Sequence, residues 1–445
     1  MAVPAPERPA NFYRLYPGLE EINYYRTGGY HPVHIGDIMH DRYRVINKLG
    51  YGGYSTVWLV KDLHLDRYAA LKILAAEAPN SAAEADVLRH LKAVQASSPG
   101  IPGGEFVVRV FDEFTVDGPN GTHQCFVTEV LGPHLELQPI GTDDWRYPID
   151  MAKRMVAQIA HGVAYLHRIG IVHGDLHLGN ILMHAPAMEN LSDHDVQTYF
   201  GEPRSGTPEC NGRYSHLKHA PDPHVPRYVV SDDLSDELFA LYFSTVHIKI
   251  CDFGEAFLWH GAPQQRDLRT PTAHAAPEIL FRDPVTPAVD VWSTAILAHC
   301  LLSGVYPFDP EPIGAVVHEL AVKWGKLPDR WWAEWSARAE WYDDDDVYIG
   351  KVPRDLLERD MWELRITQRM EGPADEIVGL EALERRMLCY RVENRISADG
   401  VVRAISAGWL EGGEELRRQI RVYVGSVLDL RKNAFVFRPA SKTAA

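Results

Sequence analysis

The sequence predicts an α+β fold of two lobes, and three observations support this class. Residues 43–74 contain short alternating apolar segments around glycine-rich turns, a pattern typical of antiparallel strands. Gly132 and Pro133 then interrupt the pattern, as expected of a connection between lobes. After that connection, segment 155–166 carries apolar residues at helical spacing. The first lobe is therefore expected to be a mainly antiparallel sheet, and the second mainly helical.

The bulk composition is that of a globular protein with an acidic balance. Of 445 residues, 46% are hydrophobic, and 45 basic side chains stand against 61 acidic ones, for a net charge of −16. This charge argues against direct nucleic-acid binding and favours a basic partner. Five scattered cysteines without a CxxC pair predict reduced thiols in the cytoplasm or nucleus. We expect no signal peptide, no membrane-spanning segment and a monomer.

Residues 49–59 predict a hairpin whose turn can approach phosphates. Gly50 and Gly52 have no side chain that would keep a phosphate away from the backbone. A Gly-x-Gly pattern alone is a weak signal, and Ser55 stands where a third glycine is usual. The hairpin is therefore a candidate nucleotide-binding element that needs support from other motifs.

A lysine follows the hairpin inside the apolar strand predicted at 68–74. Lys72 either extends from a sheet edge or reaches the phosphates of a nucleotide. Its carboxylate partner is expected on the helix predicted at 84–91. Glu84 is favoured over Glu77 because it belongs to that helix, where we expect it to lie off the apolar face.

The stretch 171–182 carries the strongest chemical signal. Asp175 and Asn180 lie between two apolar runs, which places both side chains on one tight loop. A carboxylate can orient an attacking hydroxyl and take its proton, and an amide oxygen can help to hold Mg²⁺ on nucleotide phosphates. Downstream, Asp252 ends a predicted strand and adds a second carboxylate of the metal-binding type.

Other segments allow two interpretations each. The His-rich segment 184–245 is expected to be a surface insertion rather than a metal site. The aspartates at 343–346 follow a tryptophan cluster and form either a solvated loop or a docking surface for basic peptides. Glu278 and the late Arg395 are expected to form a structural ion pair.

The ordered motifs resemble those of the eukaryotic protein kinases over residues 41–410. They comprise Gly50 and Gly52, Lys72, Glu84, Asp175, Asn180, Asp252-Phe253-Gly254, Ala276-Pro277-Glu278, Asp290 and Arg395. Within these kinases the chain is most similar to the SR-protein kinases, in segments 28–33, 35–37, 48–50, 55–59 and 129–133. The resemblance implies a two-lobed protein kinase fold, with an antiparallel sheet plus one helix in the N-lobe and a mainly helical C-lobe.

The resemblance also implies domain bounds and site residues. An N-terminal extension (1–40) would pack on the small lobe, followed by the N-lobe (41–130), the C-lobe (131–410, with the insertion 184–245) and a final helix and tail (411–445). Implied catalytic residues are Asp175, Lys72, Glu84 and His177, and implied metal ligands are Asn180 and Asp252. The implied ATP contacts are Leu49, Gly50, Gly52, Gly53, Ser55, Val57, Ala70, Lys72, Glu129, Leu131 and Leu182.

The implied function is that of an ATP- and Mg²⁺-dependent serine/threonine protein kinase that acts on basic, Arg-Ser-rich proteins. The chain departs from the family pattern at several positions. Gly174 replaces the arginine that reads an activation-loop phosphate in many kinases, so loop phosphorylation is not expected to be required. His177 replaces a usual lysine, and a protonated imidazole there would neutralise the transferred phosphoryl group.

Two other functions remain open at the level of sequence. Residues 173–180 are also similar to the aminoglycoside and choline phosphotransferases, and Pro271 stands where protein kinases are expected to have a threonine. A small-molecule phosphotransferase is therefore one alternative. A pseudokinase scaffold that binds nucleotide without transferring phosphate is the other.

Overall fold

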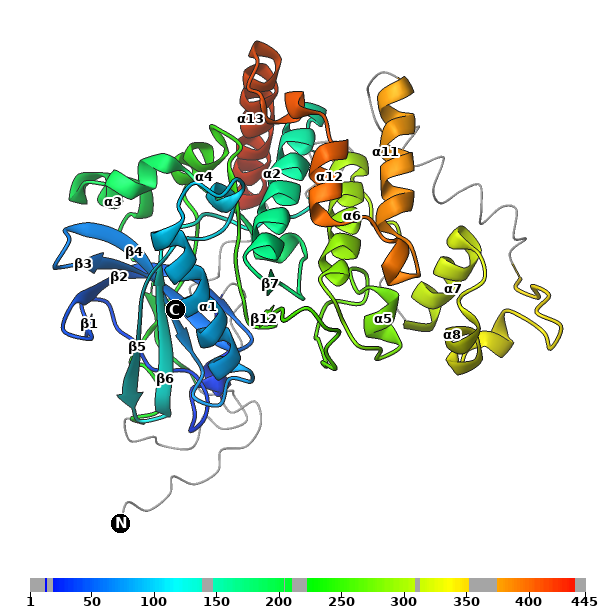
Figure 1. Cartoon of the computed structure of the whole chain (residues 1–445). Coiled ribbons are helices and arrows are strands. Elements are labelled where there is room, and N and C mark those ends of the chain that lie inside the picture. The colour runs from blue at the N-terminus through cyan, green and yellow to red at the C-terminus, as the bar shows by residue number, and fades with distance from the viewer. Residues whose placement is uncertain are drawn as a thin grey trace. The chain divides into compact units, whose positions relative to one another are not determined.

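The computed structural model describes residues 13, 19–137, 147–203, 205–209, 222–308, 313–351 and 374–436. The chain divides into two compact units (Figure 1). Unit 1 comprises Met1–Ala93, Val108–Gly132 and His184–Leu241, and unit 2 comprises Val94–Val107, Pro133–Met183 and Tyr242–Ala445. Unit 1 is rich in strands and unit 2 in helices, so the predicted α+β class is confirmed. The tail predicted at 439–445 and most of the extension before residue 19 lie outside the described residues.

Unit 1 is built on a six-stranded sheet with the order β1-β2-β3-β4-β6-β5, in which each pair of neighbours is antiparallel. The strands are β1 (Ile38–Met39), β2 (Tyr43–Gly52), β3 (Ser55–Asp62), β4 (Arg67–Leu74), β5 (Val110–Gly118) and β6 (Gly121–Thr128). Alternate residues of these strands, such as Val45, Trp58 and Leu71, fill one core. This alternation is the period of two that the sequence pattern indicated.

Helix α1 (Ser81–Ser97) lies beside this sheet (Figure 1). Its buried residues are Glu84, Ala85, Val87, Leu88 and Leu91. The expectation that Glu84 lies off the apolar face was wrong, because its exposed fraction is 3%. Positions 84, 88 and 91 recur at i, i+4 and i+7, so they share one face of the helix.

The insertion between Asn180 and Asp252 is grouped with unit 1, whereas the resemblance assigned it to the C-lobe. Its elements are η4 (Pro186–Asn190), α3 (Asp193–Phe200), β9 (Ser205–Gly206), β10 (Val229–Val230) and α4 (Asp236–Phe243), the last of which crosses into unit 2. Val230 lies in the core of the sheet. The Asp193 carboxylate accepts a hydrogen bond of 2.6 Å from the Tyr68 hydroxyl. These contacts, which join distant parts of the sequence, attach the insertion to the sheet.

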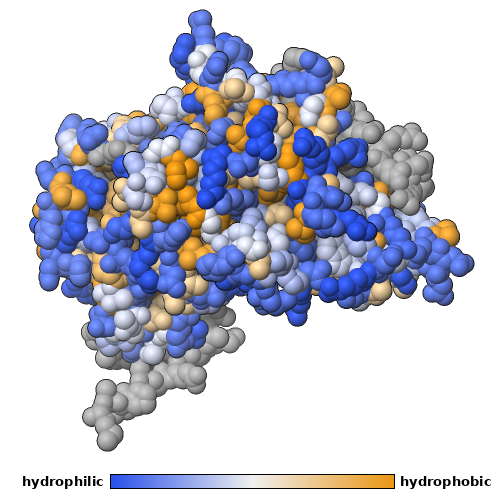
Figure 2. All heavy atoms as spheres, viewed as in Figure 1, coloured by the Kyte–Doolittle hydropathy of each residue, from blue (hydrophilic) through white to orange (hydrophobic). Residues whose placement is uncertain are grey.

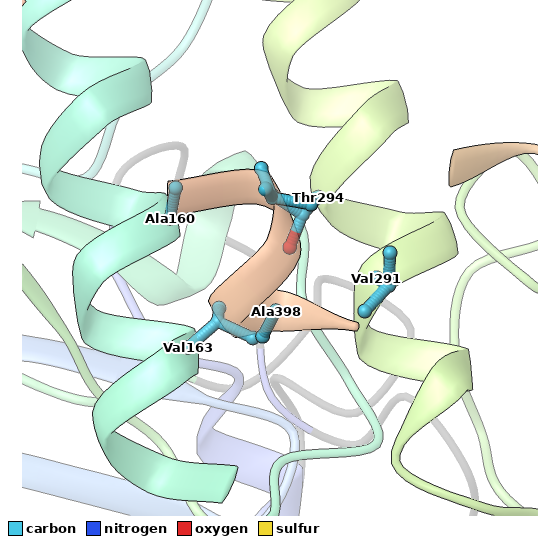
Figure 3. Close-up of a pocket in the computed structure, with 6 residues that line it drawn as sticks. Ala160, Val163, Val291, Thr294 and Ala398 are labelled. Carbon is cyan, nitrogen blue, oxygen red and sulfur yellow. The ribbon is translucent and has the colours of Figure 1, made fainter. Parts of the chain in front are cut away.

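Unit 2 is mainly helical. Its helices are η2 (Gly104–Phe106), α2 (Ile149–Arg168), η3 (Leu178–Asn180), α5 (Pro277–Leu280), α6 (Ala288–Ser303), α7 (Ile313–Trp324), α8 (Asp329–Glu334), η6 (Arg338–Glu340), α11 (Ala374–Met387), η8 (Val392–Asn394), α12 (Ala398–Ala404), η9 (Ala407–Leu410) and α13 (Glu414–Val436). Its short strands are β7 (Ile171–Val172), β8 (Ile181–Met183), β11 (Ile248–Ile250) and β12 (Phe257–Leu258). Helices α2, α6 and α12 meet around a small gap that is lined by Ala160, Val163, Val291, Thr294, Ala398 and Val401 (Figure 3). The apolar lining marks this gap as part of the core.

Hydrophilic residues cover much of the face shown in Figure 2, and apolar residues form smaller patches on it. Among the described helices, none is both long and apolar enough to span a bilayer. Cys125, Cys251, Cys300 and Cys389 are free thiols, and Cys210 lies outside the described residues.

Candidate active site

The loop between β7 and β8 holds the stretch that the sequence singled out, and Asp290 at the start of α6 fixes its backbone. The Asp290 carboxylate accepts hydrogen bonds from the backbone N–H groups of His173 and Gly174, each at 2.8 Å. His167 Nε2 lies 2.9 Å from the same carboxylate. Burial alone would raise the pKa of Asp290, but the hydrogen bonds and nearby histidines hold it below its usual value. The loop is therefore anchored from beneath by a carboxylate that is ionised at neutral pH.

His173 connects this loop to the strand that precedes Asp252. Its Nδ1 accepts a hydrogen bond from the Asp175 backbone N–H at 3.3 Å, and its Nε2 lies 3.0 Å from the Cys251 carbonyl. Since Nδ1 accepts, Nε2 carries the proton and donates to that carbonyl. The ring therefore positions the backbone of Asp175 relative to β11.

Asn180 orients the Asp175 carboxylate. Its Nδ2 donates to the Asp175 carbonyl at 2.8 Å and to Oδ2 at 3.2 Å. Asp175 Oδ1 is buried, and among the described residues it accepts no hydrogen bond. A buried carboxylate oxygen without a donor is unfavourable. Oδ1 can therefore accept a hydrogen bond from a hydroxyl group of a bound molecule.

Strand pairing brings Asn180 and Asp252 together in unit 2. Strands β8 and β11 are antiparallel, with Ile181 opposite Ile250. The Cys251 N–H also donates to the Asn180 carbonyl at 3.0 Å. Asp252 adopts a φ of 62°, which is rare for a residue with a side chain and is typical of functional sites.

The donor chemistry at these two residues fits Mg²⁺. An amide oxygen and a carboxylate are hard oxygen ligands, and Mg²⁺ on nucleotide phosphates takes only one or two protein carboxylates. Within the part of the chain that the structure describes, no group of three His, Cys, Asp or Glu side chains could hold a metal by itself. An amide oxygen and a carboxylate are therefore ligands that fit a Mg²⁺ ion also bound by nucleotide phosphates.

In unit 1, Lys72 and Glu84 form the ion pair that the sequence favoured. Lys72 Nζ lies 2.8 Å from Glu84 Oε1. Strand β4 lies between β3 and β6, so Lys72 does not extend from a sheet edge. The Glu77 carboxylate lies beside Gly28 instead. A lysine held in this way has a fixed position, as a phosphate clamp requires.

Strands β2 and β3 form the glycine-rich hairpin, with Gly52 opposite Ser55 at its turn. The candidate ATP contacts on the sheet of unit 1 are Leu49, Gly50, Gly52, Gly53, Ser55, Val57, Ala70 and Lys72, and Val57 is paired with Lys72. The N-terminal extension holds the hairpin, because the Tyr30 hydroxyl donates to the Gly52 carbonyl at 2.5 Å. In addition, Glu20 forms a buried ion pair with Lys48.

The remaining ATP-contact candidates lie elsewhere. Leu131 belongs to unit 1 and Leu182 lies on β8 of unit 2. The Glu129 carboxylate accepts a hydrogen bond from the Arg109 N–H at 2.7 Å and lies 3.3 Å from His184 Nε2. That side chain is therefore used within unit 1, and the Glu129 backbone N–H also donates to the Arg109 carbonyl at 3.1 Å.

An ion pair joins two distant positions of the segment that follows Asp252. Arg269 Nη2 lies 2.6 Å from Glu255 Oε1, and the Thr270 hydroxyl donates to the Gly174 carbonyl at 2.5 Å. Gly174 has a φ of 75°, and a Cβ there would lie 3.0 Å from the Glu255 carbonyl oxygen. An arginine at position 174 would thus be strained, and the Glu255–Arg269 pair holds the segment in its absence.

Sequence reasoning did not assign site roles to Asp290, His173, Glu255 or Arg269. A signal existed for Asp290, because a lone aspartate opens an otherwise apolar helix. The other three act through contacts that no local pattern reveals.

The chain is similar to proteins of one known family. The protein kinase domain family matches residues 43–215 and 228–404. Serine/threonine-protein kinase SRPK of Physarum polycephalum is 32% identical over 397 residues, which cover 84% of this chain and 88% of that protein. SRSF protein kinase 3 of Homo sapiens is 40% identical over 165 residues, and protein kinase dsk1 of Schizosaccharomyces pombe is 38% identical over 167. Each of these two matches covers 37% of this chain, and the chain spans only 29% and 30% of those relatives.

Proposed function

We propose, since this chain belongs to the protein kinase family and to its SRPK-like members, that it is an ATP- and Mg²⁺-dependent serine/threonine protein kinase. The observation that carries this proposal is the arrangement of Asp175, Asn180 and Asp252 in unit 2. There Asp175 has a carboxylate oxygen without a donor and is oriented by Asn180, and the pairing of β8 with β11 brings Asp252 to the same strand ends as Asn180. In unit 1, Lys72 is held by Glu84 and would supply the further cation that a phosphoryl-transfer site needs.

Each residue has a defined task in this proposal. Asp175 Oδ1 accepts the hydrogen bond of the substrate hydroxyl and takes its proton, while Asn180 holds the other carboxylate oxygen. Asn180 Oδ1 and the Asp252 carboxylate would hold Mg²⁺, and Mg·ATP supplies the phosphoryl group and neutralises its charge. Lys72, oriented by Glu84, would bind the phosphates. Positioning and electrostatics would account for most of the acceleration.

The proposed acceptor is a serine in a basic, Arg-Ser-rich protein. SRSF protein kinase 3 is by its name a kinase of SRSF proteins, and the net charge of −16 would attract a basic chain. Free cysteines fit an enzyme of the cytoplasm or nucleus. We take the protein to act as a monomer, without direct contact to nucleic acid or membrane.

Two of the four aspartates at 343–346 already have hydrogen-bond partners, so fewer carboxylates remain that could bind such a substrate. Asp346 is already engaged, because Lys326 Nζ lies 2.8 Å and the Trp332 indole N–H 2.6 Å from its carboxylate. Asp343 Oδ1 accepts the N–H groups of Asp345 and Val347 within its own turn. Of the run 343–346, the exposed carboxylates without such a role are those of Asp344 and Asp345.

Labelled ATP tests the function directly. The full chain is incubated with an Arg-Ser peptide, a matched peptide with lysine in place of arginine, an acidic serine peptide, choline and an aminoglycoside. Phosphate transfer to serine of the Arg-Ser peptide, weakened by added salt, is the expected result. Transfer to choline or the aminoglycoside instead would indicate a small-molecule phosphotransferase. Nucleotide binding without any transfer would indicate a pseudokinase scaffold.

A further inference from the structure

His177 folds back over its own loop instead of extending away from it. It is the N-terminal cap of η3, and its Nδ1 accepts a hydrogen bond from the Gly179 backbone N–H at 3.1 Å. A ring nitrogen that accepts a hydrogen bond carries no proton, so the proton lies on Nε2. An imidazolium has no lone pair on either nitrogen and could not make this bond. The geometry therefore describes a neutral ring with a single donor.

Gly179 makes this conformation of His177 accessible. A Cβ at position 179 would lie 2.8 Å from Cε1 and 2.9 Å from Nδ1 of the His177 ring. Carbon atoms that are not bonded do not approach so closely, so any side chain at 179 would displace the imidazole. His177 and Gly179 are therefore a matched pair within the sequence His-Leu-Gly-Asn.

The donor nitrogen of this ring faces the proposed base. His177 Nε2 lies 3.6 Å from Asp175 Oδ2, the oxygen that also accepts the Asn180 amide at 3.2 Å. This separation is longer than a hydrogen bond, but such contacts at catalytic groups shorten when substrate binds. Both donors thus approach the same oxygen, and Oδ1 is left without one.

A second histidine lies near this ring and adds no positive charge. His274 lies with its ring centroid 6.0 Å from that of His177, and its exposed fraction is 3%. Burial lowers the pKa of His274 to about 3, so this ring is neutral near pH 7. Tyr306 packs edge-on against it at 5.5 Å.

We propose that His177 is a positioning residue, which donates from Nε2 to Asp175 Oδ2 and so presents Oδ1 to the substrate hydroxyl. This role differs from that of a cation that meets the transferred phosphate, and it rests on the proposed kinase function. The imidazole can do this because the Gly179 N–H holds its Nδ1, which a lysine could not accept. Charge neutralisation is then left to Lys72 and to the Mg²⁺ that accompanies ATP.

Three substitutions of one residue separate the two roles. In His177→Gln the amide NH₂ can reach Asp175 as Nε2 does, and kcat is expected to stay within about threefold. In His177→Asn the amide oxygen can still accept the Gly179 N–H but no donor reaches Asp175, so kcat falls about tenfold. In His177→Lys the ammonium has N–H donors but no acceptor for the Gly179 N–H, so the side chain loses the bond that orients it, and kcat falls similarly. The KM for ATP and the dissociation constant for Mg·ADP, measured by calorimetry, are expected to stay unchanged in all three.

His260→Gln is the matched control, because His260 is exposed and lies outside the site. A second readout is independent of activity. Long-range ¹H–¹⁵N spectra of the imidazole nitrogens should include a ring with a protonated Nε2 and an unprotonated Nδ1 whose signals are lost in His177→Gln and are thereby assigned to His177.

Specific outcomes would overturn the proposal. Wild-type kcat in His177→Lys together with a large loss in His177→Gln would show that a cation is needed. Equal small effects of all three substitutions, or a proton on Nδ1, would show that the ring does not position Asp175. If the unsubstituted protein transfers no phosphate at all, the proposed function fails and this role with it, while the spectra still report whether the ring has the described geometry.

Discussion

Arg395 and Glu278 form a buried bidentate ion pair in unit 2. Their Nη1–Oε1 and Nη2–Oε2 distances are 2.6 Å and 3.0 Å, and the two side chains are 0% and 1% exposed. Arg395 also donates to the carbonyls of Ala288 and Cys389. The pairing expected from the sequence is thereby confirmed. Because both side chains are buried, each charge needs the other to offset its loss of solvation.

Removing one partner of this pair should destabilise unit 2. Glu278→Gln leaves the guanidinium buried without its charge partner, and we expect a cost of about 3–5 kcal/mol. The measurement is the midpoint of urea unfolding, followed by circular dichroism. Glu393→Gln serves as control, because Glu393 is 69% exposed in its contact with Arg391. Equal midpoints for the two variants would show that the buried pair contributes no more than a surface one.

Substitutions of Asp175 and Asp252 should have different effects on catalysis and on nucleotide binding. Asp175→Asn removes the proposed base but not the metal ligands, so Mg·ATP binding should stay within a few-fold while kcat falls by about a factor of 1,000. Asp252→Ala should lose both kcat and the Mg²⁺ dependence of nucleotide binding. Calorimetry with and without Mg²⁺, alongside the peptide assay, separates the two. Full turnover in either variant contradicts the assigned role.

The Asp290 carboxylate should give the fold an acid-sensitive component. Its pKa in the folded state lies below the ordinary 3.8, because hydrogen bonds overcome the effect of burial. Its stabilisation is therefore fully present above pH 3.8 and is lost as pH falls through the lower folded pKa. Asp290→Asn should lower the melting temperature near neutral pH, and the difference from the unsubstituted protein should shrink in acid. A difference that is constant with pH would argue against this ionised anchor.

Activity should not require phosphorylation of the segment after Asp252. Glu255 and Arg269 already close that segment, and Gly174 removes the usual reader of a phosphate. Protein made in a host without protein kinases, and then treated with phosphatase, should show full kcat. Arg269→Gln should lower kcat, whereas Thr272→Ala should not. An activity that appears only after phosphorylation of a threonine in this segment would refute the expectation.

The exposed aspartates of the 343–346 turn provide a test of substrate docking. Replacing Asp344 and Asp345 with Asn should raise KM for an Arg-Ser peptide and weaken its dependence on salt, with kcat nearly unchanged. Asp346→Asn should mainly lower stability, because its carboxylate holds Lys326 and the Trp332 indole. An unchanged KM in the double variant would show that these aspartates are only solvated and do not bind the substrate.

Local patterns predicted the parts of the molecule that depend on local order. The 171–182 loop, the hairpin at 49–59 and the Lys72–Glu84 pair follow from spacing along the chain, and the structure has the same elements. In the tryptophan cluster that precedes the aspartates at 343–346, Trp331, Trp332 and Trp335 are buried together.

Contacts between distant residues account for what the sequence did not predict. Placement of the insertion depends on Val230 entering the sheet core, and the loss of Asp346 as a docking group depends on Lys326. The burial of Glu84 has a local cause that the prediction did not use, because positions 84, 88 and 91 share one face of the helix. The tautomer of His177 could not be predicted either, since it depends on one backbone N–H.

The N-terminal extension lies before the residues that match the family, yet it makes buried contacts with the glycine-rich hairpin. The family match begins at residue 43, yet Glu20 neutralises the buried Lys48 and Tyr30 holds the Gly52 carbonyl. A chain cut at the family boundary would keep the lysine in the interior without its carboxylate. Substitution at position 20 is therefore coupled to substitution at position 48. The conformation of this hairpin therefore depends on a segment that lies before the family match.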